Sequence, residues 1–166
     1  MHQHDPAPAG DPRDLAGPFY HRMTIPVRFA DTDAQGHVNN AVYLTYCESA
    51  RIRYWTEVSG EPFAPGIEGG LGLILADARI TYRAQVFYGE LVTVETRVAR
   101  IGRSSFDMEQ RLVAAGPDGP TRLAAVSGSV LVRYDYTSAH PVPLSAPHIA
   151  ALEAYEGRAL RGAPPP

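Results

Sequence analysis

The residues with the greatest capacity for chemistry lie between Arg28 and Asn40, in the segment RFADTDAQGHVNN. This segment holds two carboxylates, Asp31 and Asp33, and a histidine, His37. A carboxylate can act as a base for water or as a direct nucleophile. The residues that follow predict a helix, whose first N–H groups are unpaired and favour negative charge. A base or nucleophile and an oxyanion donor can therefore come from one short segment.

The helix that would position this chemistry is predicted from Ala41 to about Ser59. Asn39 or Asn40 can cap its start, and Gly60 can end it. Its apolar side chains recur at helical spacing. They are Tyr43, Tyr46, Cys47, Ala50, Tyr54 and Val58. The side chains expected in solvent are Glu48, Arg51, Arg53 and Glu57. A helix with so much apolar surface must be covered on most sides by other structure.

Alternating apolar and polar residues predict strands on both sides of this helix. The first covers 20–30, where Pro26 indicates an edge strand. Later strands are expected over 73–86, 91–101, 106–112 and 124–135, joined by short turns that favour an antiparallel arrangement. A short helix is expected over 145–155. We expect one domain over 20–156, between disordered tails at 1–19 and 157–166.

Composition excludes several classes of function. The chain has 166 residues and a net charge of -3, so nothing indicates nucleic-acid binding. All 15 basic residues are arginine, which excludes lysine-based chemistry. The single cysteine, Cys47, excludes an internal disulfide and a cysteine metal site, and it is expected to be a packed thiol. Signal sequences and membrane-length apolar runs are not found, so we expect a cytoplasmic protein without membrane, metal or cofactor.

The motif D-x-D-x-x-G-H-V-N-N-x-x-Y, with the helix after it, resembles the hotdog-fold thioesterases. The type that it most resembles is that of 4-hydroxybenzoyl-CoA and acyl-CoA thioesterases, over about Met23 to Tyr136. The resemblance implies an α+β hotdog fold, in which a curled five-stranded antiparallel sheet wraps around one long central helix. It also implies a homodimer or a dimer-of-dimers tetramer, with active sites at the dimer interface.

The resemblance also implies roles for individual residues. Asp33 matches the catalytic carboxylate of the family, and Asn40 matches the position whose backbone N–H polarises the thioester carbonyl. His37 could orient the substrate or assist proton transfer, and an ordinary turn histidine is an equal alternative. Gln35 and Asn39 are candidates for substrate contact, although Asn39 is most simply a helix cap. A strand-turn segment that touches the CoA nucleotide in relatives matches Arg103, Ser104 and Ser105.

The spelling H-V-N-N is also similar to that of plant acyl-carrier-protein thioesterases, so the acyl carrier stays open between CoA and a carrier protein. For Asp33, the alternative to catalysis is a turn aspartate bonded to its own backbone. Asp31 is expected to be structural. The implied activity is hydrolysis of an acyl-CoA thioester to the free acid and CoA. The alternatives are a hotdog hydratase of enoyl thioesters and a non-catalytic acyl-CoA-binding protein.

Overall fold

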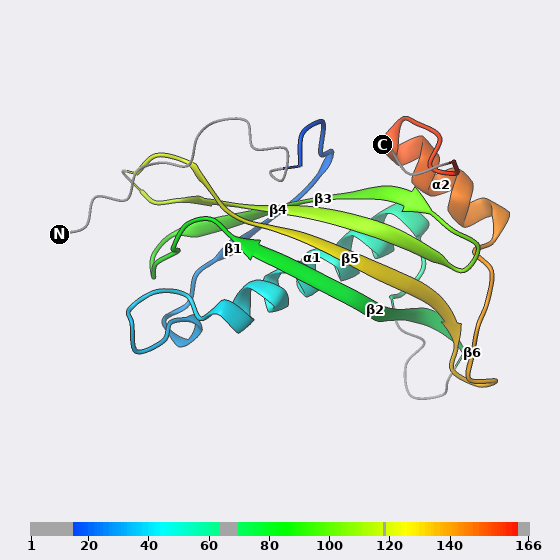
Figure 1. Ribbon diagram of the computed structural model, residues 1–166, viewed down its shortest axis with the longest axis horizontal. Coiled ribbons are helices and arrows are strands. Elements are labelled where there is room, and N and C mark those ends of the chain that lie inside the picture. The colour runs from blue at the N-terminus through cyan, green and yellow to red at the C-terminus, as the bar shows by residue number, and fades with distance from the viewer. Residues whose placement is uncertain (1–14, 64–69, 118, 163–166) are drawn as a thin grey trace.

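The computed structural model describes residues 15–63, 70–117 and 119–162. Within these residues it contains a six-stranded antiparallel sheet and two α-helices (Figure 1). The strands are β1 (His21–Pro26), β2 (Leu71–Tyr82), β3 (Leu91–Ile101), β4 (Ser105–Ala115), β5 (Arg122–Asp135) and β6 (His140–Pro141). The α-helices are α1 (Asn40–Ser59) and α2 (Ala146–Glu156). A short 3-10 helix, η2 (Phe29–Asp31), precedes α1. The predicted α+β class is confirmed.

The sheet has the order β1-β3-β4-β5-β2, and β6 pairs with β5. The prediction of five strands is therefore wrong by one. The additional strand, His140–Pro141, has only two residues. A pair of residues is too short to show alternation in sequence, so only its pairing with Tyr134 and Asp135 reveals it. The edge position predicted from Pro26 is confirmed, because β1 has β3 as its only neighbour among the described strands.

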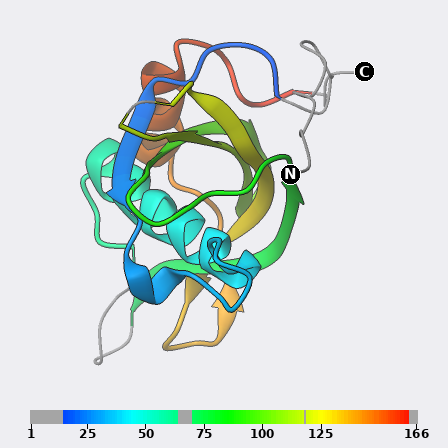
Figure 2. The ribbon, with the colours of Figure 1, turned by 90° about the vertical axis from the view of Figure 1, so that its left-hand side faces the viewer.

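The predicted helix is present as α1, which has 20 residues. Asn39 caps it by accepting a hydrogen bond from the N–H of Ala41, and Gly60 ends it in the left-handed conformation with φ 73°. The sheet is curled, and α1 lies beside it (Figure 2). Cys47 is fully buried in the core, which raises the pKa of its thiol to about 11. The packed thiol expected from the sequence is confirmed.

The long helix is not the only one in the core, because α2 packs at the C-terminal end of α1. Leu152 of α2 is fully buried in one apolar cluster with Trp55 of α1 and Phe106 of β4. The rings of Trp55 and Phe106 are stacked, with centroids 5.6 Å apart. Among the described residues, no helix is long and apolar enough to cross a membrane.

Both predicted tails are wrong where the structure describes them. Phe19 is 5% exposed and lies between the guanidinium groups of Arg97 and Arg111, at 4.3 and 4.4 Å from its ring centroid. At the other end, Leu160 is buried and its carbonyl accepts a hydrogen bond from the N–H of Ile101. Both segments are therefore packed against the sheet at these residues. The remainder of the predicted tails, 1–14 and 163–166, lies outside the described residues.

Arg51 was expected in solvent, and this prediction is wrong. Arg51 is 4% exposed, and within the described part of the chain its Nε and Nη1 atoms have no hydrogen-bond partner. It follows the fully buried Cys47 by about one helical turn, so it points to the same side of α1. Burial lowers the pKa of Arg51. The residue type favours solvent, but its position on the helix decides where it lies.

A buried guanidinium with two nitrogens that have no partner among the described residues costs free energy, and this gives a first prediction. Replacing it by a flexible apolar side chain, Arg51→Met, should raise the free energy of unfolding by about 1 kcal/mol or more. Urea denaturation of the two proteins checks this, with the exposed Arg53→Met as the matched control, for which little change is expected. Destabilisation by Arg51→Met would contradict the prediction and indicate that Arg51 has a partner outside the described residues.

Candidate active site

Asp31 anchors the segment that carries the candidate chemistry. Its side chain is buried and accepts hydrogen bonds from Arg28 Nη2 at 2.7 Å and from the Arg28 backbone N–H at 2.9 Å. The Tyr46 hydroxyl of α1 donates to it at 2.8 Å. The bonds from Arg28 hold the pKa of Asp31 below its ordinary value, against the effect of burial. Asp31 thus ties the end of the first strand to α1, and its expected structural role is confirmed.

Asp33 lies in the tight turn that follows. The Asp33 N–H donates to the His37 carbonyl at 3.0 Å, and the Asp33 carbonyl accepts from the Gly36 N–H at 3.0 Å. Gly36 adopts a φ of 83°, which favours glycine. One carboxylate oxygen of Asp33 accepts from the Gln35 N–H at 2.9 Å, and the other lies 3.7 Å from His37 Nδ1. About a fifth of each side chain is exposed, 21% for Asp33 and 23% for His37.

The start of α1 presents a free backbone donor. The Ala41 N–H is taken by the side-chain oxygens of Asn39 and Asn40, at 2.9 and 3.0 Å. The Val42 N–H donates to the Asn39 carbonyl at 2.9 Å. Among residues 15–63, 70–117 and 119–162, no group accepts a hydrogen bond from the Asn40 N–H. An unpaired N–H at a helix start is suited to bind an anionic oxygen.

Tyr82 was not among the candidate residues, and the structure places it at this site. Its hydroxyl donates to the Asn40 carbonyl at 2.8 Å, and its ring packs edge-to-face on Tyr43 with centroids 5.2 Å apart. Burial raises the pKa of Tyr43 to about 12, so its hydroxyl stays protonated. Tyr82 therefore fastens the helix start to the end of β2. No local signal in the sequence could show a contact between residues so far apart in the chain.

The other candidate substrate contacts differ in position. Gln35 is exposed, next to Asp33. The side-chain oxygen of Asn39 is engaged as the helix cap, which agrees with the simpler expectation. Arg103, Ser104 and Ser105 lie at the turn between β3 and β4, where the Ser104 carbonyl accepts from the Arg133 N–H at 2.7 Å. This turn and the motif are at opposite ends of β3, whose 11 residues span about 30 Å. Within one chain, Arg103, Ser104 and Ser105 are therefore too far from Asp33 to share a site with it.

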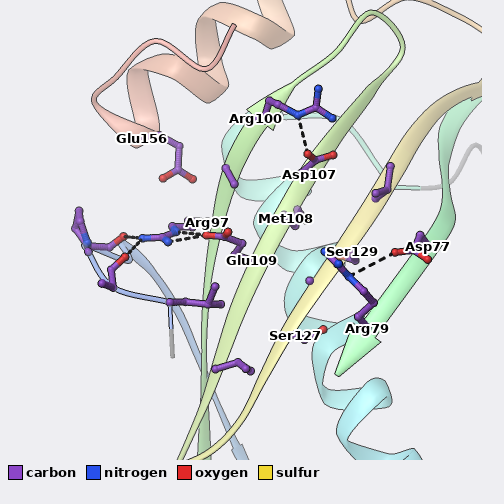
Figure 3. A pocket seen from close by; sticks show the side chains of 18 of the residues that line it. Asp77, Arg79, Arg97, Arg100, Asp107, Met108, Glu109, Ser127, Ser129 and Glu156 are labelled. Atoms are coloured by element: carbon purple, nitrogen blue, oxygen red, sulfur yellow. Dashed lines mark hydrogen bonds and ion pairs between the residues drawn. The ribbon is translucent and has the colours of Figure 1, made fainter. Parts of the chain in front are cut away.

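A cavity of about 970 Å³ lies away from this site, on the sheet face that α1 does not cover. Charged side chains line it in pairs: Arg97 with Glu109 at 2.6 Å and Arg100 with Asp107 at 2.8 Å (Figure 3). Neither Asp33 nor Asn40 contributes to it. In the described part of the chain, no group of three His, Cys, Asp or Glu residues could hold a metal ion. The candidate chemistry therefore stays with the turn and the helix start.

Comparisons with known proteins identify the family of this chain. A family model described as the thioesterase-like superfamily matches residues 27–152. A crystal structure of a thioesterase from Thermus thermophilus, complexed with coenzyme A and zinc, is 36% identical. The match covers 84% of this chain and 96% of that one, with a TM-score of 0.69. This chain belongs to the thioesterase-like superfamily, and the prediction of a thioester hydrolase is confirmed.

Two more distant structures support the fold alone. A thioesterase-superfamily protein from Jannaschia sp. CCS1 is 24% identical, with a TM-score of 0.77 and 89% of each chain covered. A variant of 4-hydroxybenzoyl-CoA thioesterase, complexed with 4-hydroxybenzoyl-CoA, is 18% identical with a TM-score of 0.70. That match covers 79% of this chain and 96% of the other. The predicted hotdog fold and its resemblance to the 4-hydroxybenzoyl-CoA thioesterase type are confirmed.

The anchor at Asp31 gives a second prediction. Asp31→Asn should lower the free energy of unfolding by about 2 kcal/mol at neutral pH, because it removes the charge from a buried carboxylate that accepts several hydrogen bonds. The folded-state pKa of Asp31 is lowered, so its contribution is present above its unfolded pKa and disappears as the pH falls through the lowered value. The free energies of unfolding of the wild type and of Asp31→Asn should therefore differ at neutral pH and agree at strongly acidic pH. Denaturant titrations at the two pH values measure this.

The control for this prediction is Asp33→Asn, which changes a more exposed carboxylate in the same turn. It should leave the unfolding free energy nearly unchanged at both pH values. Equal destabilisation by the two substitutions would show that Asp31 is not the anchor.

Proposed function

We propose that this protein hydrolyses acyl-CoA thioesters to the free acid and CoA, with Asp33 and the Asn40 N–H as its catalytic groups. The observation that carries this proposal is the Asn40 N–H at the start of α1, which has no acceptor among the described residues and follows the partly exposed Asp33 in the same motif. The relative of known structure that binds coenzyme A supports the choice of carrier.

The chemistry requires an oxygen nucleophile and a donor for the oxyanion. The Asp33 oxygen that is not bonded to Gln35 can remove a proton from water, and the hydroxide then attacks the thioester carbon. Alternatively, the same oxygen attacks directly and gives an anhydride that water hydrolyses. In both routes the Asn40 N–H and the helix dipole stabilise the oxyanion, typically by about 3 kcal/mol. The C–S bond then breaks, and the thiolate leaves without strong acid assistance.

His37 has a secondary role in this proposal. Its Nδ1 lies 3.7 Å from the Asp33 carboxylate and 3.3 Å from the Val38 carbonyl. This position suits a group that orients Asp33 and assists its proton transfer. Gln35 supports the same carboxylate through its backbone N–H. The proposal therefore uses four residues of one turn and one helix start.

The catalytic proposal is tested with Asp33→Asn. This variant should lose thioesterase turnover and keep its folding, because the amide is neither a base nor a nucleophile. Release of free thiol from a panel of acyl-CoA substrates measures turnover, and circular dichroism measures folding. Asp77→Asn, an exposed carboxylate in β2, is the control and should stay active. Full activity of Asp33→Asn would refute the mechanism.

The same assays separate the alternative functions. Hydration of crotonyl-CoA without release of CoA would support an enoyl-thioester hydratase. Tight binding of acyl-CoA without any thiol release would support a non-catalytic binding protein. No observation on the described residues favours either alternative over hydrolysis.

We also propose that two copies pair through β2. This strand is at the edge of the sheet, and among the described residues only β5 pairs with it. Edge strands present unpaired N–H and C=O groups that can pair with another chain. Large apolar side chains are exposed on β2 and on α1, with Leu75 of β2 at 47% and Ile52 of α1 at 41%. A symmetric dimer would cover both, and a tetramer could form from two such dimers.

An antiparallel pair of β2 strands has a consequence for the substrate site. It places the start of the second copy's β2 beside the end of the first, where Tyr82 holds Asn40. The second copy's β3–β4 turn then lies at the same end of the assembly as Asp33. In this arrangement the β3–β4 turn of the second copy can contact the CoA of a substrate bound at Asp33. Arg103, Ser104 and Ser105 are far from Asp33 of their own chain. In the dimer they would instead serve the active site of the other copy.

Substitution of the exposed apolar residues tests this arrangement. The double variant Ile52→Glu/Leu75→Glu should have the mass of one chain by light scattering, since buried carboxylates would oppose pairing. It should also lose thioesterase activity. Leu91→Glu is the control, because Leu91 is 49% exposed in β3, away from β2. A wild-type protein that is monomeric and active would contradict the proposal.

A further inference from the structure

Three large aromatic side chains are exposed at the end of the molecule that carries the motif. Phe29 is 77% exposed, Tyr88 64% and Phe87 43%. Phe29 belongs to η2, and the other two lie in the loop between β2 and β3. The rings of Phe29 and Tyr88 meet edge-to-face, with centroids 5.8 Å apart and planes at 90°. Contiguous exposed apolar surface is a feature of binding sites, and aromatic rings contribute large contact area there.

Hydrogen bonds connect both rings to the candidate active site. The Phe29 carbonyl accepts from the N–H and the hydroxyl of Thr32, the residue before Asp33, at 3.1 and 2.8 Å. The Val38 N–H, beyond the turn, donates to the carbonyl of Val86 at 2.8 Å. Figure 2 shows the motif turn and the β2–β3 loop at the end that faces the viewer. Backbone hydrogen bonds therefore connect the two segments that carry the rings to the two sides of the motif turn.

The charge around this pair suits a ligand with phosphate groups. Arg28 precedes Phe29, and its side chain is 71% exposed. Its Nε and Nη2 atoms bond Asp31, so its position is fixed. A guanidinium has five N–H donors, and those not used by Asp31 can bond a phosphate oxygen. An exposed cation thus directly precedes Phe29, the first of the two exposed rings, in the chain.

We propose that Phe29 and Tyr88 form the subsite for the adenine base of the CoA carrier. This inference rests on the proposed function, because the thioester must lie at Asp33 and Asn40 for the nucleotide to reach the rings. A base has a flat π-face, and stacking on an aromatic side chain stabilises its binding. An acyl carrier protein has no adenine base, so it could contact this surface only through its own side chains. The two carriers therefore make different demands on the rings, and this difference can be measured.

The decisive experiment compares two substrates that share one acyl group, the CoA thioester and the pantetheine thioester, which lacks the nucleotide. In Phe29→Ala and Tyr88→Ala, the KM for the CoA thioester should rise roughly 10-fold, the effect of about 1.4 kcal/mol. The kcat should not change, because the base is bound equally in the ground and transition states. The KM for the pantetheine thioester should also stay unchanged. Equal effects on both substrates, or none, would overturn the subsite.

Two variants provide matched controls. Tyr20→Ala removes an aromatic side chain that is 57% exposed but distant from the motif, and it should change neither KM. Phe29→Tyr keeps a ring for stacking and should restore the wild-type KM for the CoA thioester. Because Phe29 and Tyr88 are mostly exposed, the alanine variants should fold, and thermal unfolding confirms this before kinetics.

Calorimetric titration with CoA itself separates this proposal from the proposed function. Both alanine variants should bind CoA roughly 10-fold more weakly than the wild type, whether or not the protein turns over any thioester. Unchanged CoA binding with normal turnover would overturn the subsite and leave the hydrolase intact. A rise in KM for an acyl-carrier-protein substrate, with none for acyl-CoA, would also overturn it and assign the rings to a protein carrier.

Discussion

The buried carboxylate of Asp31 is the interaction on which the site depends. It joins Arg28 at the end of the first strand to Tyr46 inside α1, and the Asp31 carbonyl accepts from the Asn39 N–H at 2.9 Å. A carboxylate that is 1% exposed would be unstable without these bonds. Because the bonds come from the strand, the cap residue and the helix, they fix the direction in which α1 begins. That direction determines where the Asn40 N–H, which has no acceptor among the described residues, is presented.

The site is a balance between satisfied and unsatisfied groups. Most polar atoms around the turn have partners: the Asp33 carboxylate accepts from Gln35, and Tyr82 donates to the Asn40 carbonyl. Against this background the unpaired Asn40 N–H is suited to electrostatic preorganisation. Arg51 shows that an unpaired group is not by itself a site, because its nitrogens without partners among the described residues are buried in the core. Exposure beside a partly free carboxylate distinguishes the helix start from the buried guanidinium.

Much of the fold can be predicted from the sequence, because local periodicity records it. The bounds predicted for β3 agree with those observed, and the caps of α1 follow from Asn39 and Gly60. The bounds of β2 were less accurate: it ends at Tyr82, before the predicted 86. The motif segment could be selected from sequence because its residues are neighbours in the chain. The ring pair at Phe29 and Tyr88 could not, because the loop of Tyr88 returns to Phe29 only in the folded sheet.

Local sequence accounts for the turn at Gly36, the cap at Asn39 and the alternating strands, and one short motif indicates the family. Contacts between residues that are distant in the chain arise only in the folded molecule. The tertiary structure buried Arg51, packed Phe19 between two arginines, joined Tyr82 to Asn40 and placed Arg103 at the far end of β3. The physical reason is that periodicity reports the face of each element, whereas sheet order and curvature determine what that face contacts.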